Sequence, residues 1–136
     1  MKKQTFIVTY ILFFLLMMML GSVYTYSIYR TELEHTLQIN TTLSGLPYMT
    51  SLAFFALAMF FSGKYNSINH AKKLSALGGT LLVLAWLIAA SASSIWVLIF
   101  SYGVMMGSAV GILYGIPLML INQQEIQRKG FYSGLM

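Results

Sequence analysis

The sequence of 136 residues contains no cysteine and little charge of either sign. Without cysteine the chain cannot form a disulfide, carry a lipid on a thiol or bind a metal through a thiolate. Charged residues make up 8% of the chain, whereas about a quarter is usual in a soluble domain. Hydrophobic residues make up 58%. This composition predicts an all-α integral membrane protein.

Acidic and histidine residues are scarce and fall outside the long apolar runs. The acids are Glu32, Glu34 and Glu125, and the two histidines are His35 and His70. A carboxylate at membrane depth is the usual device for coupling protons to transport, so the apolar runs contain no proton relay, and a small four-helix multidrug exporter is disfavoured. The histidines have no partner at metal-ligand spacing. We expect no metal, no cofactor and no enzyme activity, because phosphate loops, nucleophile elbows and paired carboxylates are also absent.

Four apolar runs are long enough to cross a bilayer, which takes about 20 residues. We predict membrane helices at about 6–28, 46–62, 74–90 and 95–121, with the start of a fifth at 131–136, all in one transmembrane domain spanning 1–136. The first run is longer than the apolar core of a signal peptide, so we expect it to be retained. A polar loop is predicted at 29–43, a polar and basic stretch at 63–79 and a tight turn at 91–94.

The cations predict how these helices are oriented. A pI of about 9.6 would also suit a nucleic-acid-binding protein, but the cations do not share one helix face, so no nucleic-acid partner is expected. With the N-terminus inside, Arg30 stands alone on one side, and the other side holds Lys2, Lys3, Lys64, Lys72, Lys73, Arg128 and Lys129. The positive-inside rule then predicts a multi-pass protein of the cell (plasma) membrane with a cytoplasmic N-terminus.

Glycines recur at every fourth position in the last apolar run, at Gly103, Gly107, Gly111 and Gly115. On a helix they form one smooth stripe that allows close approach of another backbone. The stripe favours static helix packing over the alternative, a surface on which helices slide during a conformational cycle.

The end of the first run is unusually polar for a helix that faces lipid. It contains Tyr24 and Tyr26 among glycine, serine and threonine. Polar side chains at this depth usually face the bundle interior or a water-filled cavity, but tyrosines near a helix end also serve as interfacial anchors. The sequence leaves both readings open.

Several stretches form a pattern known from one transporter family. The patterns are G-S-x-Y-x-x-S at 21–27, F-F-A-L-x-M at 54–59 and Y-G-V-x-x-G-x-x-x-G-x-x-Y-x-x-P at 102–117. Gly63, Lys72 and Lys73, with the glycine pair at 78–79, fit a signature loop between helices two and three. In these residues the chain resembles the major facilitator superfamily, and within it the oxalate/formate antiporter-like branch. The signature aspartate is replaced by Ser67, so the cytoplasmic charge lock that the resemblance implies would be weaker here or differently made.

The resemblance implies the N-terminal part of a secondary transporter that moves a small solute, with an organic anion as one class, by alternating access. Such transporters have about twelve helices in two halves, of which this chain would supply four and the start of a fifth. Helices one and four would line the solute path, with Tyr24, Tyr26 and Tyr114 as polar contacts. The expected partners are the lipid bilayer, the solute, and the missing transporter helices or another membrane subunit. The alternative is a truncated or non-transporting four-helix protein that associates with another membrane subunit.

Overall fold

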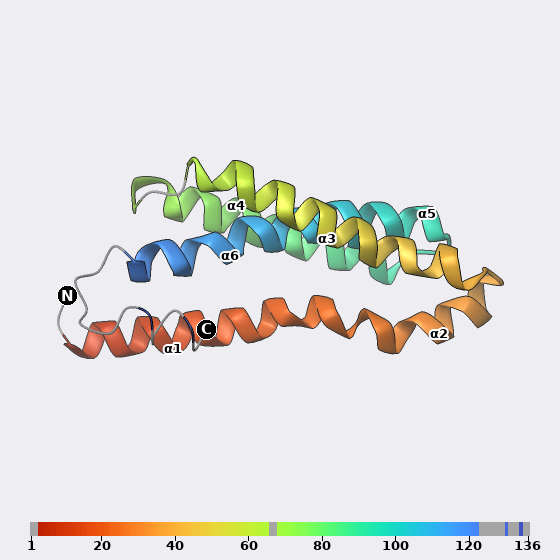
Figure 1. Ribbon diagram of the computed structural model, residues 1–136, viewed down its shortest axis with the longest axis horizontal. Helices are drawn as coiled ribbons and strands as arrows, with labels where there is room; N and C mark the ends of the chain where they lie inside the picture. The colour runs from red at the N-terminus through yellow and green to blue at the C-terminus, as the bar shows by residue number, and fades with distance from the viewer. Residues whose placement is uncertain (1–2, 66–67, 123–129, 131–133, 135–136) are drawn as a thin grey trace.

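The computed structural model describes residues 3–65, 68–122, 130 and 134. All regular structure in these residues is helical, which confirms the predicted all-α fold. The elements are α1 (Lys3–Leu20), η1 (Gly21–Thr25), α2 (Tyr26–Leu37), α3 (Thr41–Gly63), α4 (Ile68–Ala90), α5 (Ile95–Leu98), η2 (Ile99–Met106) and α6 (Gly107–Asn122). Figure 1 shows them as long rods lying side by side.

Four helical stretches of the described chain are long and apolar enough to cross a membrane, as expected for a multi-pass membrane protein. They are the first span (Ile7–Leu37), the second (Thr41–Gly63), the third (Asn69–Ala90) and the fourth (Ile95–Leu120). The first span joins α1, η1 and α2, and the fourth joins α5, η2 and α6. Two segments depart from α geometry, because η1 is a tighter 3₁₀ turn and η2 is a wider π-helical segment.

The predicted polar loop at 29–43 is wrong, because the helix continues to Leu37 and the next begins at Thr41. Polar residues stabilise the helix here, since Arg30 pairs with Glu34 one turn later at 3.2 Å. The helix ends at Gln38, whose φ of 51° is left-handed, and Asn40 caps the next one by accepting a hydrogen bond from the Leu43 amide at 2.9 Å.

Two helices also begin earlier than predicted, because the polar residues before the apolar runs are helical as well. α4 begins at Ile68, so Lys72 and Lys73 lie in its early turns and not in a loop. α3 begins at Thr41 and not at about residue 46, so Pro47 lies inside this helix. The bilayer limits the length of an apolar run but not of a helix, which continues into water where the following residues allow it.

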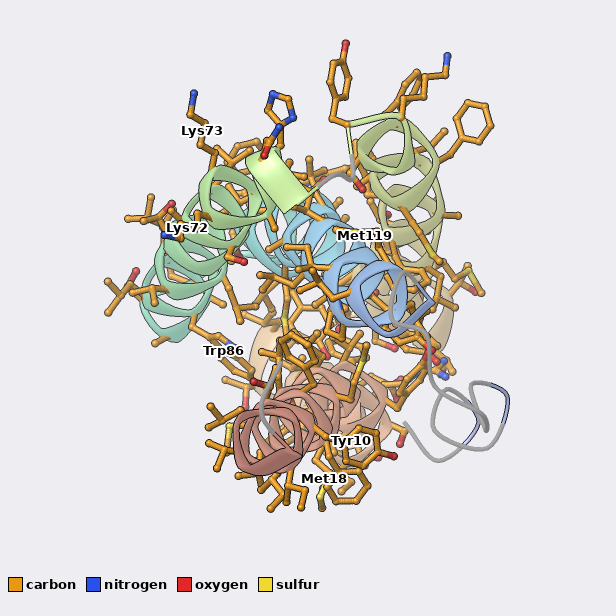
Figure 2. All side chains as sticks on the ribbon, turned by 90° about the vertical axis from the view of Figure 1, so that its left-hand side faces the viewer. Tyr10, Met18, Lys72, Lys73, Trp86 and Met119 are labelled. Atoms are coloured by element: carbon orange, nitrogen blue, oxygen red, sulfur yellow. The ribbon has the colours of Figure 1, made fainter. Side chains whose placement is uncertain are left out.

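The fourth span is the centre of the bundle. In its most apolar stretch 56% of the residues are buried, against 17%, 22% and 11% in the first, second and third spans. Those three expose large apolar side chains such as Met19, Phe60 and Leu87. Viewed along the bundle, Met18 of α1 points away from the other helices (Figure 2). Such faces suit contact with lipid chains.

Candidate functional site

The glycine stripe lies against the second span. A methyl group at Gly103 would lie 3.2 Å from the carbonyl oxygen of Pro47. At Gly107 it would collide with the carbonyl of Ser51, and at Gly111 with that of Phe55. The glycines and the carbonyls advance together in steps of four residues, so the two helices run parallel with their backbones in close contact.

The last glycine of the stripe, Gly115, is also buried. The second and fourth spans therefore meet through the stripe within this chain. At Gly103, Gly107 and Gly111 no room is left for a separate subunit.

An aromatic cluster joins all four spans near one end of the bundle. It consists of Tyr26, Tyr48, Trp86 and Tyr102, one residue from each span. The Tyr26 ring centroid lies 4.9 Å from that of Tyr102 and 6.2 Å from that of Tyr48. The Trp86 ring meets Tyr102 edge-on at 6.3 Å.

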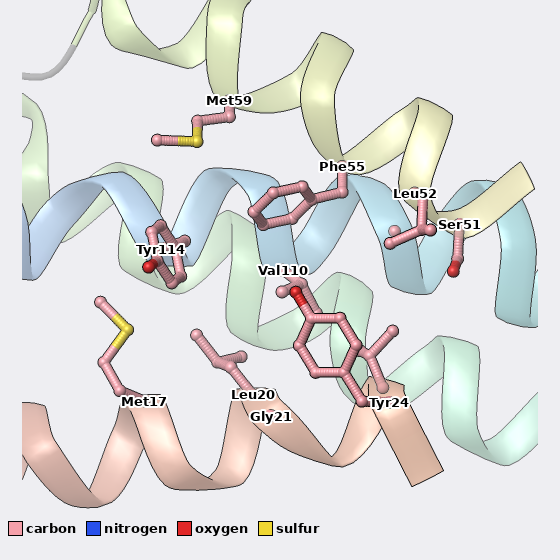
Figure 3. Close-up of a pocket in the computed structure, with 12 residues that line it drawn as sticks. Met17, Leu20, Gly21, Tyr24, Ser51, Leu52, Phe55, Met59, Val110 and Tyr114 are labelled. Atoms are coloured by element: carbon pink, nitrogen blue, oxygen red, sulfur yellow. The ribbon is translucent and has the colours of Figure 1, made fainter. Parts of the chain in front are cut away.

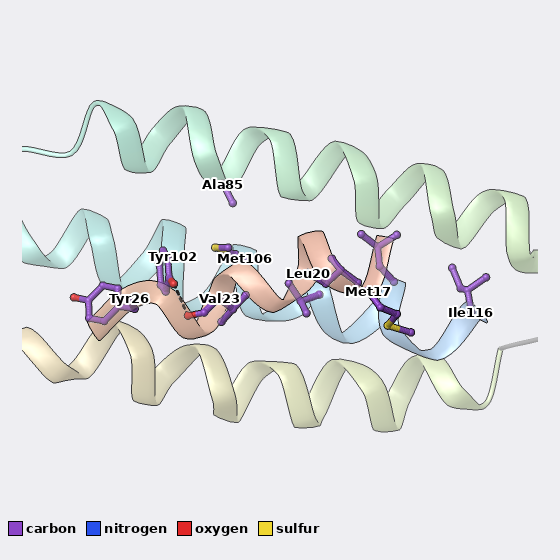
Figure 4. Packing of buried hydrophobic residues seen from close by; sticks show 10 residues of the cluster. Met17, Leu20, Val23, Tyr26, Ala85, Tyr102, Met106 and Ile116 are labelled. Carbon is purple, nitrogen blue, oxygen red and sulfur yellow. Dashed lines mark hydrogen bonds between the residues drawn. The ribbon is translucent and has the colours of Figure 1, made fainter. Parts of the chain in front are cut away.

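Two hydroxyls of this cluster donate hydrogen bonds to backbone carbonyls of other spans. Tyr26 donates to the carbonyl of Ser44 and Tyr102 to that of Val23, both at 2.8 Å; Figure 4 shows the second bond. In hydrocarbon no water is available to take their place, so these bonds join the first span to the second and to the fourth.

A central cavity of about 380 Å³ lies between the first, second and fourth spans (Figure 3). Its wall is mostly apolar and contains the polar residues Tyr24, Ser51 and Tyr114, of which Ser51 is fully buried. The lining residues are Met17, Leu20, Gly21, Val23, Tyr24, Ser51, Leu52, Phe55, Met59, Gly107, Val110 and Tyr114. The structure thus brings together two of the three tyrosines predicted on a solute path.

The third tyrosine, Tyr26, lines a separate end cavity of about 260 Å³. The other residues of this wall are Tyr24, Ser27, Arg30, Gly45, Tyr48 and Met49. Tyr24 borders both cavities and is 61% exposed. Tyr24 therefore borders a cavity and is also exposed enough to act as an interfacial anchor, so both readings of this residue stay open.

A polar cluster beside the end cavity joins α2 to α3. The Nε of Arg30 lies 2.9 Å from the hydroxyl of Ser44 and 3.2 Å from a carboxylate oxygen of Glu34. Arg30 also donates to the backbone carbonyl of Thr41, and the Ser44 hydroxyl contacts the same Glu34 oxygen. Ser44 is fully buried. Arg30, predicted as a loop residue, thus helps to close a helical hairpin.

Three residues of the predicted signature loop, Gly63, Lys72 and Lys73, are exposed in the structure. Gly63 ends α3 and has open space around it. Lys72 and Lys73 are exposed on α4, and Figure 2 shows Lys73 pointing outward. Among the residues that the structure describes, neither lysine forms a salt bridge. Ser67 and the predicted fifth helix at 131–136 lie outside the described residues.

Residues 3–65 and 68–122, with 130 and 134, contain no group of three acidic, histidine or cysteine residues placed to hold a metal. The sequence did not predict three residues of these features: Tyr48 in the end cavity, Ser51 at the central cavity and Tyr102 in the aromatic cluster. Tyr102 stands in the motif of the fourth span, but its spacing does not reveal a partner 79 residues away.

No family model, curated protein or solved structure matches this chain. The resemblance to the major facilitator superfamily therefore remains a hypothesis that depends on the sequence motifs alone.

Proposed function

We propose that the chain is the N-terminal part of a secondary membrane transporter that moves a small solute by alternating access. The observation that carries this proposal is the central cavity, which the predicted path residues Tyr24 and Tyr114 line together. Its volume of about 380 Å³ falls within the range of roughly 300–1,000 Å³ found for small-molecule sites.

The wall of the central cavity suits recognition of a small solute. Tyr114 packs edge-on against Phe55, with ring centroids 5.6 Å apart, which holds its ring at the cavity. The Ser51 side chain beneath this wall is fully buried, and its hydroxyl donates to the carbonyl of Tyr48 at 2.7 Å, so the hydroxyls left for a solute are those of Tyr24 and Tyr114. A few placed hydroxyls in an apolar wall give orientation without the cost of a buried charge.

Small organic anions are the proposed solute class, as the resemblance implies. Arg30, which pairs with Glu34, lies in the wall of the end cavity, and Tyr24 lies between that cavity and the central one. In the proposed arrangement the remaining helices of the transporter cover the open side of the central cavity and complete the path. Lipid surrounds the exposed faces of the first and third spans.

The proposed location is the plasma membrane, with the N-terminus in the cytoplasm. Seven cations on one side of the four spans against one on the other support this orientation. A reporter domain fused after Lys73 should be cytoplasmic, and one inserted between Ser91 and Ser94 should be external. The reverse pattern would overturn the orientation.

A flux assay tests the proposed function. The chain is placed in lipid vesicles, alone and, if its gene continues, joined to the rest of the transporter. The vesicles are then screened for uptake of labelled small organic anions and neutral solutes. Tyr114→Phe should weaken the apparent affinity about fivefold, because one hydrogen bond is worth about 1 kcal/mol. The control is Tyr65→Phe, an exposed tyrosine outside both cavities. Absence of flux for every solute would remove transport and favour a membrane subunit that associates with another chain.

A further inference from the structure

The two non-α segments of the membrane spans meet each other. In the first span η1 is overwound, and its residues lie closer to the helix axis than in an α-helix. In the fourth span η2 is π-helical, a geometry that is rare and often found at functional sites. The hydroxyl of Tyr102, in η2, donates to the carbonyl of Val23, in η1, at 2.8 Å.

Side-chain hydroxyls hold both segments. In η1 the Thr25 hydroxyl donates to the carbonyl of Ser22 at 2.7 Å, so two successive carbonyls of this turn accept hydroxyl protons. In the fourth span the fully buried Ser101 donates to the carbonyl of Val97 at 2.7 Å. Because the hydrocarbon core offers no water to backbone carbonyls, the tight turn depends on these hydroxyls.

The overwound turn forms one wall of the central cavity. Gly21, Val23 and Tyr24 all line it, whereas Tyr102 does not. A wider helical turn also rotates the residues before it relative to those after it, by up to about 100° for one inserted residue. Within the π-helical segment Tyr102 reaches the first span, whereas its neighbour Gly103 and the following Gly107 face the second span.

We propose that Tyr102 is a positioning residue of the central cavity. Its hydroxyl holds the carbonyl of Val23 and so fixes the turn that presents Gly21, Val23 and Tyr24 to the cavity. The π-helical segment carries Tyr102 to this carbonyl, and a change in its helical register would release the turn and reshape the cavity wall. The proposal rests on the proposed function only in taking the cavity as the solute site.

Thiol labelling in the full chain tests this proposal, because the chain contains no cysteine of its own. Gly21→Cys places a reporter in the cavity wall, where an added Cβ meets nothing within 4 Å. Gly79→Cys is the matched reporter on α4, with open space around it as well. Labelling by N-ethylmaleimide is timed in lipid nanodiscs, with and without Tyr102→Phe, a substitution that keeps the ring against Tyr26 and Trp86.

We expect Tyr102→Phe to speed labelling at position 21 about fivefold, the effect of one lost hydrogen bond on a local equilibrium, and to leave position 79 unchanged. Tyr26→Phe separates positioning from general stability, since it removes another tyrosine–carbonyl bond of 2.8 Å whose acceptor lies on α3. Tyr26→Phe should lower the melting temperature by as much as Tyr102→Phe does. It should leave the rate of labelling at position 21 nearly unchanged. 4-Aminophenylalanine in place of Tyr102 restores a donor and should restore slow labelling.

Equal labelling at position 21 with and without Tyr102→Phe would overturn the proposal, as would an equal increase with Tyr26→Phe. If the phenylalanine variant does not fold, the 4-aminophenylalanine variant with slow labelling still supports the proposal, and fast labelling overturns it. Failure of the flux assay is a separate result, because it would remove the transporter function without changing the labelling rates.

Discussion

The fourth span meets two neighbours in opposite ways. Against the second span its glycines touch backbone carbonyls, with no space left between the helices. Against the first span it meets side chains, one tyrosine–carbonyl bond and the central cavity. Protein interiors resist small changes in volume only where they are close-packed. The first contact should therefore be rigid, and the second can change shape around a solute.

The largest expected effect comes from filling the rigid contact. Gly107→Ala should lower the free energy of unfolding by about 2–3 kcal/mol, because overpacking a close-packed contact costs about this much and the new methyl meets the backbone of Ser51. Thermal unfolding in detergent measures the loss. Gly79→Ala is the control, with nothing within 4 Å of the added group. Equal melting temperatures for the two variants would show that the contact is looser than described.

A smaller effect is expected where the first span is anchored to the second. Glu34→Gln removes the charge that faces Arg30 and Ser44, and should lower the free energy of unfolding by about 1 kcal/mol. The value is modest because the Arg30 and Glu34 side chains remain 38% and 26% exposed. Glu32→Gln, an exposed change of the same kind on the same helix, should cost less than about 0.5 kcal/mol. If Glu32→Gln were as costly, the loss would reflect charge on α2 in general.

The smallest effect is expected on the cavity side. Gly21→Ala adds the same methyl group as Gly107→Ala, but into open space in the cavity wall. The free energy of unfolding should change by less than about 0.5 kcal/mol. In the flux assay the same substitution should change the apparent affinity for the solute, because residue 21 lines the cavity. A stability loss close to that of Gly107→Ala would mean that the two contacts are equally tight, and would remove the comparison.

The sequence predicts those features that depend on one helix at a time. The bilayer sets the length of an apolar run, so the four spans can be located from hydropathy. Small residues in steps of four predict a close helix contact, and Gly103, Gly107 and Gly111 form one. The helix ends could not be found this way, because the polar residues after Ile28 stay helical through the pairing of Arg30 with Glu34.

The site is only partly predictable, because it depends on contacts between distant segments. Tyr24 and Tyr114 attract attention as polar residues in apolar runs, and both line the central cavity. Tyr26 is likewise a polar residue in an apolar run, but it does not line the central cavity, and its hydroxyl donates to the backbone carbonyl of Ser44. The role of Tyr102 depends on a 3₁₀ turn and a π-helical segment that meet in space. No periodicity in the sequence marks either departure from α geometry.

The most direct test of this account is a pair of distance distributions between spin labels in the membrane. One pair joins Leu57→Cys in the second span to Phe100→Cys in the fourth, and the other joins Met19→Cys in the first span to Phe100→Cys; all three side chains are exposed. We expect a narrow distribution for the first pair and a broader one, or one with two peaks, for the second. Equally narrow distributions in both would contradict the account, because the first span would then be as rigidly held as the second.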